Sequence, residues 1–102
     1  MTIPIDNLPP IHPGEILRDE LEALGLSASK FAEHLRVPVN RVTAILAGSR
    51  SVTADTALRL ARYLGTTSRM WLNLQQRYDL KIAEMKTGKA IEARVQPRER
   101  AA

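Results

Sequence analysis

The residues best suited to specific contacts with another molecule cluster in one short segment, residues 39–44. If Val42, Ile45 and Leu46 face inward at helical spacing, five side chains remain on the outer face: Val39, Asn40, Arg41, Thr43 and Ala44. Arginine pairs well with guanine, asparagine with adenine, and small methyl groups with the methyl of thymine. The segment therefore predicts a surface that reads base edges in DNA. The alternative, that these residues only solvate an exposed helix, stays open at this point.

A second group of side chains has the chemistry to bind DNA phosphates. Hydroxyl groups, cations and the N–H groups at helix N-termini bind phosphate oxygens and set register without reading sequence. Residues of this kind flank the reading segment: Ser27, Ser29, Lys30, Arg36, Arg50, Ser51 and Thr53. We expect them to position the protein on a duplex, although the serines would also be explained as helix caps.

Two short helices are needed to present these groups. Ser27 is a good N-cap for a helix over about 28–35, and Pro38 prevents that helix from continuing. A second helix is expected over about 39–47, and the small side chain of Ala32 suits the point where the two helices cross. These dimensions are those of a helix-turn-helix.

Three further helices follow from caps and apolar periodicity. We expect them over about 13–24, 54–64 and 68–85. Pro13 suits the first turn of its helix, because its missing N–H would have no partner there. The predicted fold is therefore an all-α domain of five helices.

The segment beyond the last helix is expected to be distinct. We assign residues 1–85 to one domain for DNA binding and dimerisation, and residues 86–102 to a basic C-terminal tail. The short alternating stretch from Ile91 to Val95 leaves two possibilities for the tail, a frayed end or a strand that orders against a partner.

The last helix is also the candidate dimer element. Two half-sites one DNA turn apart, about 34 Å, require a two-fold dimer. Its large apolar residues are spread over more of the helix circumference than a single stripe facing the core would occupy. They are Trp71, Leu72, Leu74, Tyr78 and Leu80. The alternative places Trp71 in the core of its own subunit.

Composition excludes several classes of protein. The 102 residues suit one domain and contain no cysteine, so disulfides and thiolate chemistry are excluded. His12 and His34 are the only histidines, and no catalytic constellation accompanies them. We expect a cytoplasmic protein without enzymatic activity, bound metal, cofactor, signal peptide or membrane span.

Charge is distributed unevenly along the chain. Residues 1–26 carry five acidic residues and one basic residue, whereas the excess of base that makes the net charge +4 lies beyond them. An acidic N-terminal segment and a basic remainder suggest that the protein binds two different partners.

Six stretches form a recognisable pattern: Ile11-His12-Pro13-Gly14-Glu15-Ile16-Leu17, Val37-Pro38 with Asn40-Arg41, Ile45-Leu46-Ala47-Gly48, Thr53-Ala54-Asp55-Thr56-Ala57-Leu58-Arg59-Leu60-Ala61, Trp71-Leu72-Asn73-Leu74-Gln75 and Tyr78-Asp79-Leu80. Because of these stretches, the segment from Ile11 to about Glu84 resembles the HigA/VapI-type antitoxins. They belong to the phage-repressor-like Xre helix-turn-helix family, whose DNA-binding domain is built of five helices. One departure is Arg36, since many members have glycine in the turn; a left-handed conformation there would cost on the order of 1 kcal/mol.

The resemblance implies a homodimer that binds operator DNA, represses its own operon and neutralises a co-expressed HigB-type toxin, a small basic RNase. An acidic surface formed by Asp19, Glu20 and Glu22 would then face the toxin. Two alternatives remain: a stand-alone Xre-type repressor with no toxin partner, and a protein-binding module whose helix-turn-helix has lost DNA.

Overall fold

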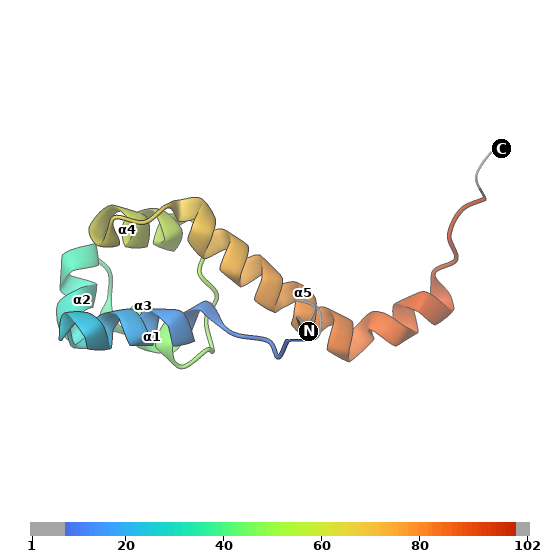
Figure 1. Ribbon diagram of the computed structural model, residues 1–102, viewed down its shortest axis with the longest axis horizontal. Helices are drawn as coiled ribbons and strands as arrows, with labels where there is room; N and C mark the ends of the chain where they lie inside the picture. Colours follow the sequence, from blue (N-terminus) through green and yellow to red (C-terminus); the bar gives the residue numbers. More distant parts are fainter. Residues whose placement is uncertain (1–7, 100–102) are drawn as a thin grey trace, which may run out of the picture.

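The computed structural model describes residues 8–99, in which five helices and no strands occur (Figure 1). The helices are α1 (Pro13–Leu24), α2 (Ala28–Leu35), α3 (Val39–Leu46), α4 (Ala54–Leu64) and α5 (Ser68–Arg94). The predicted all-α fold is confirmed, and the first four helices begin and end within one residue of their predicted bounds. Residues 1–7 of the expected domain and 100–102 of the expected tail lie outside the described range.

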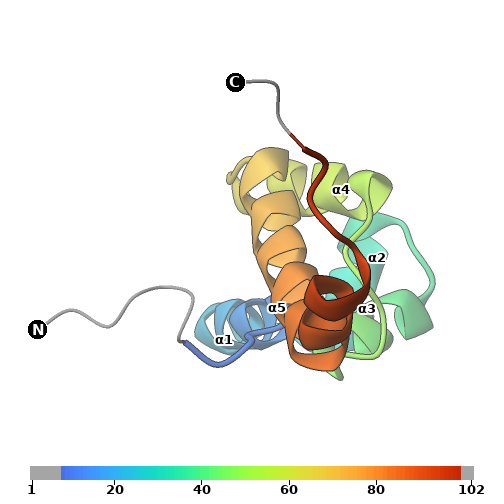
Figure 2. The same ribbon diagram turned by 90° about the vertical axis from the view of Figure 1, so that its right-hand side faces the viewer.

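The first part of α5 packs against α4 and α1, and the second part of α5 projects from the body formed by α1 to α4 (Figures 1 and 2). Helix α3 packs against α1 and α2, whereas α4 packs against α2 and α5. The helix-turn-helix is thus supported by α1 on one side and by α4 on another.

One apolar core joins all five helices. Its largest fully buried side chains are Trp71 and Phe31, and Ala32, 2% exposed, lies in the core as expected for the crossing of α2 and α3. The Nε1–H of Trp71 donates to Oγ1 of Thr66 at 2.8 Å, so the polar edge of the indole is satisfied. The remaining core residues are Leu17, Leu21, Leu35, Val42, Ile45, Val52, Ala57 and Leu60.

The start of α1 is tied closely to the end of α3. Nδ1 of His12 accepts from the backbone N–H of Gly14 at 2.9 Å, and Oε2 of Glu15 accepts from the N–H of His12 at 3.1 Å, which completes a capping box. A Cβ atom on Gly14 would overlap with the carbonyl group of Ile45. Only glycine allows α1 and α3 to approach this closely.

Helix α5 is longer than expected. It was predicted to end near Met85, but it spans 27 residues and ends at Arg94. The possibility of a strand around Ile91 to Val95 is therefore wrong, since Ile91 to Arg94 are helical. Alanine, lysine and glutamate dominate this stretch and favour helix, while the single Gly88 costs about 1 kcal/mol without ending it. Within residues 8–99, no helix combines the length and apolar character needed to cross a bilayer.

Replacing Gly14 with alanine tests the close approach of α1 to α3. We expect Gly14→Ala to lower the free energy of unfolding by about 1 to 3 kcal/mol, because the new methyl group forces the two helices apart. Urea denaturation measures the change. Gly88→Ala is the matched control; there an added Cβ meets only the Cβ of Glu84, at 3.9 Å, and stability should rise by about 0.5 to 1 kcal/mol. Equal effects of the two substitutions would contradict the packing.

Candidate nucleic-acid interface

Helix α3 has one buried and one open face. Val42 and Ile45 are each 2% exposed and lie in the core. The five residues predicted to read bases are accessible: Val39, Asn40 and Thr43 are exposed, and Arg41 and Ala44 are half-buried. The structure thus brings the predicted set together on the side of α3 that the core does not use.

The turn between α2 and α3 is closed by a left-handed residue. Arg36 has φ 60° and ψ 46°, and it is the only residue other than glycine with positive φ in the described part of the chain. The N–H groups of Arg36 and Val37 donate to the carbonyls of Glu33 and Ala32, which satisfies the end of α2. An arginine here carries the strain expected for a left-handed position, on the order of 1 kcal/mol.

The predicted phosphate-binding residues are all exposed: Ser27, Ser29, Lys30, Arg36, Arg50, Ser51 and Thr53. Ser27 caps α2, and its Oγ accepts from the N–H of Lys30 at 3.2 Å, so its hydroxyl proton is still free to donate. Thr53 precedes α4 as expected but makes no side-chain capping bond; its Oγ1 lies 3.4 Å from Oγ1 of Thr56.

Sequence reasoning missed an ion-pair network beside the predicted base-reading residues. Oδ2 of Asp55 accepts from Nη1 of Arg41 at 2.8 Å and from Nε of Arg59 at 2.9 Å. Nη1 of Arg59 also donates to the carbonyl oxygen of Leu35 at 2.9 Å. The network therefore connects α3, α4 and the end of α2. The spacing of Asp55 and Arg59 is a helical i,i+4 signal, but no local pattern marks the contact with Arg41.

The two guanidinium groups hold the pKa of Asp55 below its ordinary value. The hydrogen bond from Arg59 is the largest cause, and the hydrogen bond from Arg41 is the second. The carboxylate therefore stays ionised at neutral pH. Because the folded pKa is depressed, the small stabilisation from the network is present above the ordinary pKa of 3.8 and is lost as pH falls through the lowered value.

A second missed residue anchors the loop after α3. Gln75 is buried, and its Oε1 accepts from the N–H of Val52 at 2.8 Å while its Nε2 donates to Oδ1 of Asp79 at 2.9 Å. This contact holds α5 to the loop that carries Arg50 and Ser51. The only signal for it in the sequence was its place in the Trp71-Leu72-Asn73-Leu74-Gln75 stretch.

One of the predicted dimer residues is excluded from that role. Trp71 is 1% exposed and belongs to the apolar core of its own chain, so its assignment to a dimer interface is wrong. Leu72 and Leu74 are half-buried and pack against the core, Tyr78 is half-buried, and Leu80 is 60% exposed.

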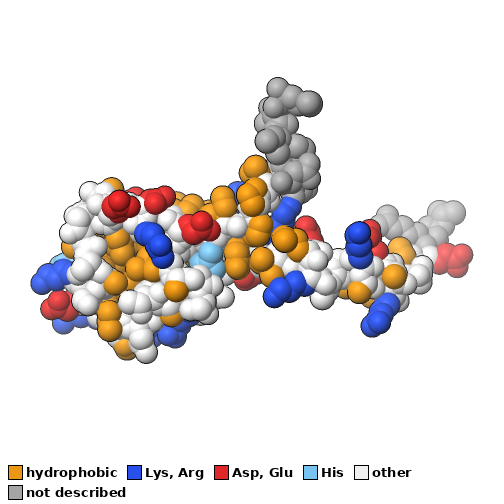
Figure 3. All heavy atoms as spheres, turned by 90° about the horizontal axis from the view of Figure 1, so that it is seen from below, with side chains coloured by type: hydrophobic (Ala, Val, Ile, Leu, Met, Phe, Trp, Pro, Cys, Tyr) orange, Lys and Arg blue, Asp and Glu red, His pale blue; other side chains and the backbone are white. Residues whose placement is uncertain are grey.

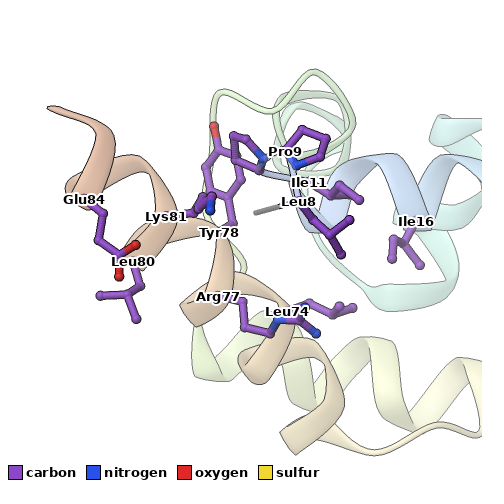
Figure 4. Close-up of a pocket in the computed structure, with 11 residues that line it drawn as sticks. Leu8, Pro9, Ile11, Ile16, Leu74, Arg77, Tyr78, Leu80, Lys81 and Glu84 are labelled. Carbon is purple, nitrogen blue, oxygen red and sulfur yellow. The ribbon is translucent and has the colours of Figure 1, made fainter. Parts of the chain in front are cut away.

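Leu74, Tyr78 and Leu80 line a largely apolar hollow of about 280 Å³ (Figure 4). Its other side is formed by Leu8, Ile11 and Ile16, and the charged groups of Arg77, Lys81 and Glu84 border it. Figure 3 shows hydrophobic side chains gathered where the segment before α1 meets α5, with lysine and arginine along the projecting part of α5.

The acidic residues predicted to face the toxin, Asp19, Glu20 and Glu22, are all exposed on α1. Asp19 also lines a hollow with Leu46 and Gly48, so this acidic surface borders the C-terminal end of α3.

The two histidines have structural roles. His12 caps α1, and its ring meets Tyr78 edge-on with centroids 4.9 Å apart. His34 stacks on Tyr63, with ring centroids 4.9 Å apart. Within residues 8–99, no three His, Cys, Asp or Glu side chains gather in a way that could hold a metal ion.

Substitutions of Arg36 test whether the turn between α2 and α3 is left-handed. We expect Arg36→Val to lower the free energy of unfolding by about 1 to 2 kcal/mol, because a β-branched side chain resists positive φ. Arg36→Asn should leave stability within about 0.5 kcal/mol of the wild type, since asparagine tolerates this conformation. Thermal or urea denaturation checks both variants. A Val variant as stable as the Asn variant would show that the turn is not left-handed.

Comparison with known proteins identifies the family. The family described as Helix-turn-helix matches residues 17–72. Virulence-associated protein I of Dichelobacter nodosus is 52% identical over 87 residues, which cover 82% of this chain and 81% of that protein.

Two solved structures are similar over most of both chains. An addiction module antidote protein of the HigA family from Coxiella burnetii is 60% identical, with a TM-score of 0.86, over 89% of this chain and all of the other. The Pseudomonas aeruginosa antitoxin HigA with the higBA promoter is 43% identical, with a TM-score of 0.85, over 87% of this chain and 98% of that one. The chain therefore belongs to the Xre-type helix-turn-helix family, within its group of HigA/VapI-type antitoxins.

Proposed function

We propose that this protein is the antitoxin of a two-gene module that binds its own operator as a homodimer and neutralises a HigB-type RNase toxin. The DNA-binding part of the proposal rests on one observation. Asn40, Arg41 and Thr43 are accessible on a helix whose opposite face is buried in the core. A HigA antitoxin of the same fold has been solved with its promoter DNA, which supports the same use of this face.

Helix α3 has the chemistry and the setting of a major-groove reader. Arg41 is suited to O6 and N7 of guanine, and Asn40 to N6 and N7 of adenine. Thr43 and Ala44 add methyl groups for thymine. The hydroxyls and cations at the start of α2 and after α3 flank this helix, and they would hold the phosphates on either side of the groove.

Dimerisation would use the hollow between α1 and α5. Leu80 and Ile16 are 60% and 38% exposed, and together with Leu74 and Tyr78 they form an apolar surface with a charged border. A surface of this kind is typical of protein interfaces. A two-fold dimer is what two operator half-sites require.

The acidic surface of α1 would face the toxin. Three exposed carboxylates on one helix suit a basic partner, and they would raise the rate of association more than the affinity itself. Because Asp19 borders the end of α3, a bound toxin would lie close to the DNA-reading helix.

The assignment of reading and positioning residues is tested on two duplexes, the chain's own promoter and a random sequence of equal length. Arg41→Ala or Asn40→Ala should cost about 1 to 3 kcal/mol on the promoter and little on random DNA, because each removes a base contact. Lys30→Ala should weaken both equally and flatten the salt dependence by about one unit.

The matched control is Lys89→Ala, which removes an exposed cation from the projecting part of α5. Lys89→Ala should change the affinity for the promoter and for random DNA less than Lys30→Ala does. If Arg41→Ala and Asn40→Ala reduce binding to both duplexes equally, α3 does not read sequence.

The toxin partner is tested with the product of the adjacent reading frame. We expect co-purification and blocked RNA cleavage, and the triple variant Asp19→Asn, Glu20→Gln, Glu22→Gln should slow association by about tenfold or more at low salt. A control variant that loses two carboxylates elsewhere, Glu92→Gln, Glu99→Gln, should associate at nearly the wild-type rate. If no adjacent RNase binds the protein, it acts as a stand-alone repressor.

A further inference from the structure

The contact between Asp55 and Arg41 joins an acidic residue of α4 to the residue proposed to read guanine. We propose that Asp55 is a positioning residue that sets the sequence selectivity of DNA binding by holding Arg41 in place. The inference rests on the proposed DNA-binding function and adds a residue to it that does not itself contact a base.

The geometry leaves Arg41 both restrained and usable. Its side chain is 26% exposed, and Nη1 is 2.8 Å from Oδ2 of Asp55. A guanidinium has five N–H donors, so one contact leaves others free for a base edge. An arginine already held in one direction loses less side-chain freedom when it binds than an unrestrained one.

The carboxylate is itself fixed to the support of the helix-turn-helix. Oδ2 of Asp55 is shared with Nε of Arg59, and Nη1 of Arg59 is bonded to the carbonyl oxygen of Leu35. Leu35 is the last residue of α2, directly before the left-handed Arg36. Hydrogen bonds through Asp55 therefore link Arg41 to the end of α2 as well as to α4. The side chain of Asp55 is itself 58% exposed.

The charge of Asp55 also favours sequence selectivity. A carboxylate beside Arg41 offsets part of the attraction between that guanidinium and phosphates, which all DNA sequences share. Directional hydrogen bonds to a guanine edge form only at the right base pair. A restrained and partly neutralised arginine thus loses more of its general attraction than of its base-specific attraction.

The test is Asp55→Asn, measured on the promoter and random duplexes. Asparagine retains an oxygen that accepts hydrogen bonds but lacks the charge. We expect affinity for random DNA to rise, and the ratio of promoter to random affinity to fall by about tenfold, within the range for one base-specific contact. The salt dependence on random DNA should steepen by about one unit. Urea denaturation of the variant verifies that the fold is retained.

A double variant shows whether Asp55 acts through Arg41. In an Arg41→Ala background, Asp55→Asn should leave the affinity ratio unchanged, because the group that it positions is gone. Glu92→Gln is the control for loss of one negative charge; Glu92 is exposed on α5, and its substitution should leave the ratio at the wild-type value.

Two results would overturn the proposal: a ratio of promoter to random affinity that is unchanged in Asp55→Asn, or an equal fall of that ratio with and without Arg41. These differ from a failure of the proposed function. In that case the wild-type protein itself would bind its promoter no better than random DNA, and the positioning role would be refuted with it.

Discussion

The structure depends on the burial of one side of α3. This helix has eight residues, fewer than an isolated helix needs to be stable in water. Its direction is therefore set by packing, through Val42 and Ile45, which are almost fully buried against the neighbouring helices. Because these positions face inward, Asn40, Arg41 and Thr43 point away from the core. The same burial that stabilises the domain thus determines which side chains are free to meet DNA.

The elements around α3 restrict it from several directions. Gly14 brings the start of α1 against the carbonyl of Ile45, and Gln75 anchors the following loop to α5. The bond from Arg59 to Leu35 holds the preceding turn to α4. These contacts involve polar groups and backbone, so they fix position more than they add stability. A rigid frame of this kind is what a binding surface made of few side chains requires.

Local patterns were sufficient for most of the fold and for the accessible side of α3. Ser27 and Pro38 marked boundaries, as did the glycines after α1, α3 and α4, and apolar spacing identified the buried sides. The length of α5 was missed, because the exposed second part of the helix has no clear apolar stripe. Trp71 was misassigned, since periodicity alone cannot say whether a large apolar residue is buried by its own chain or by a partner. The contact of Arg41 with Asp55 was not predictable, because the two residues are 14 positions apart and meet only through the packing of α3 and α4.

The central claim is that DNA meets the open face of α3 while its buried face stays in the core. Amide NMR spectra recorded during titration with the promoter duplex test this directly. The account predicts that the largest shift changes fall on residues 39–44, with smaller ones at 27–30 and 50–53. Unchanged signals for α3, with the main changes on the projecting part of α5, would contradict it.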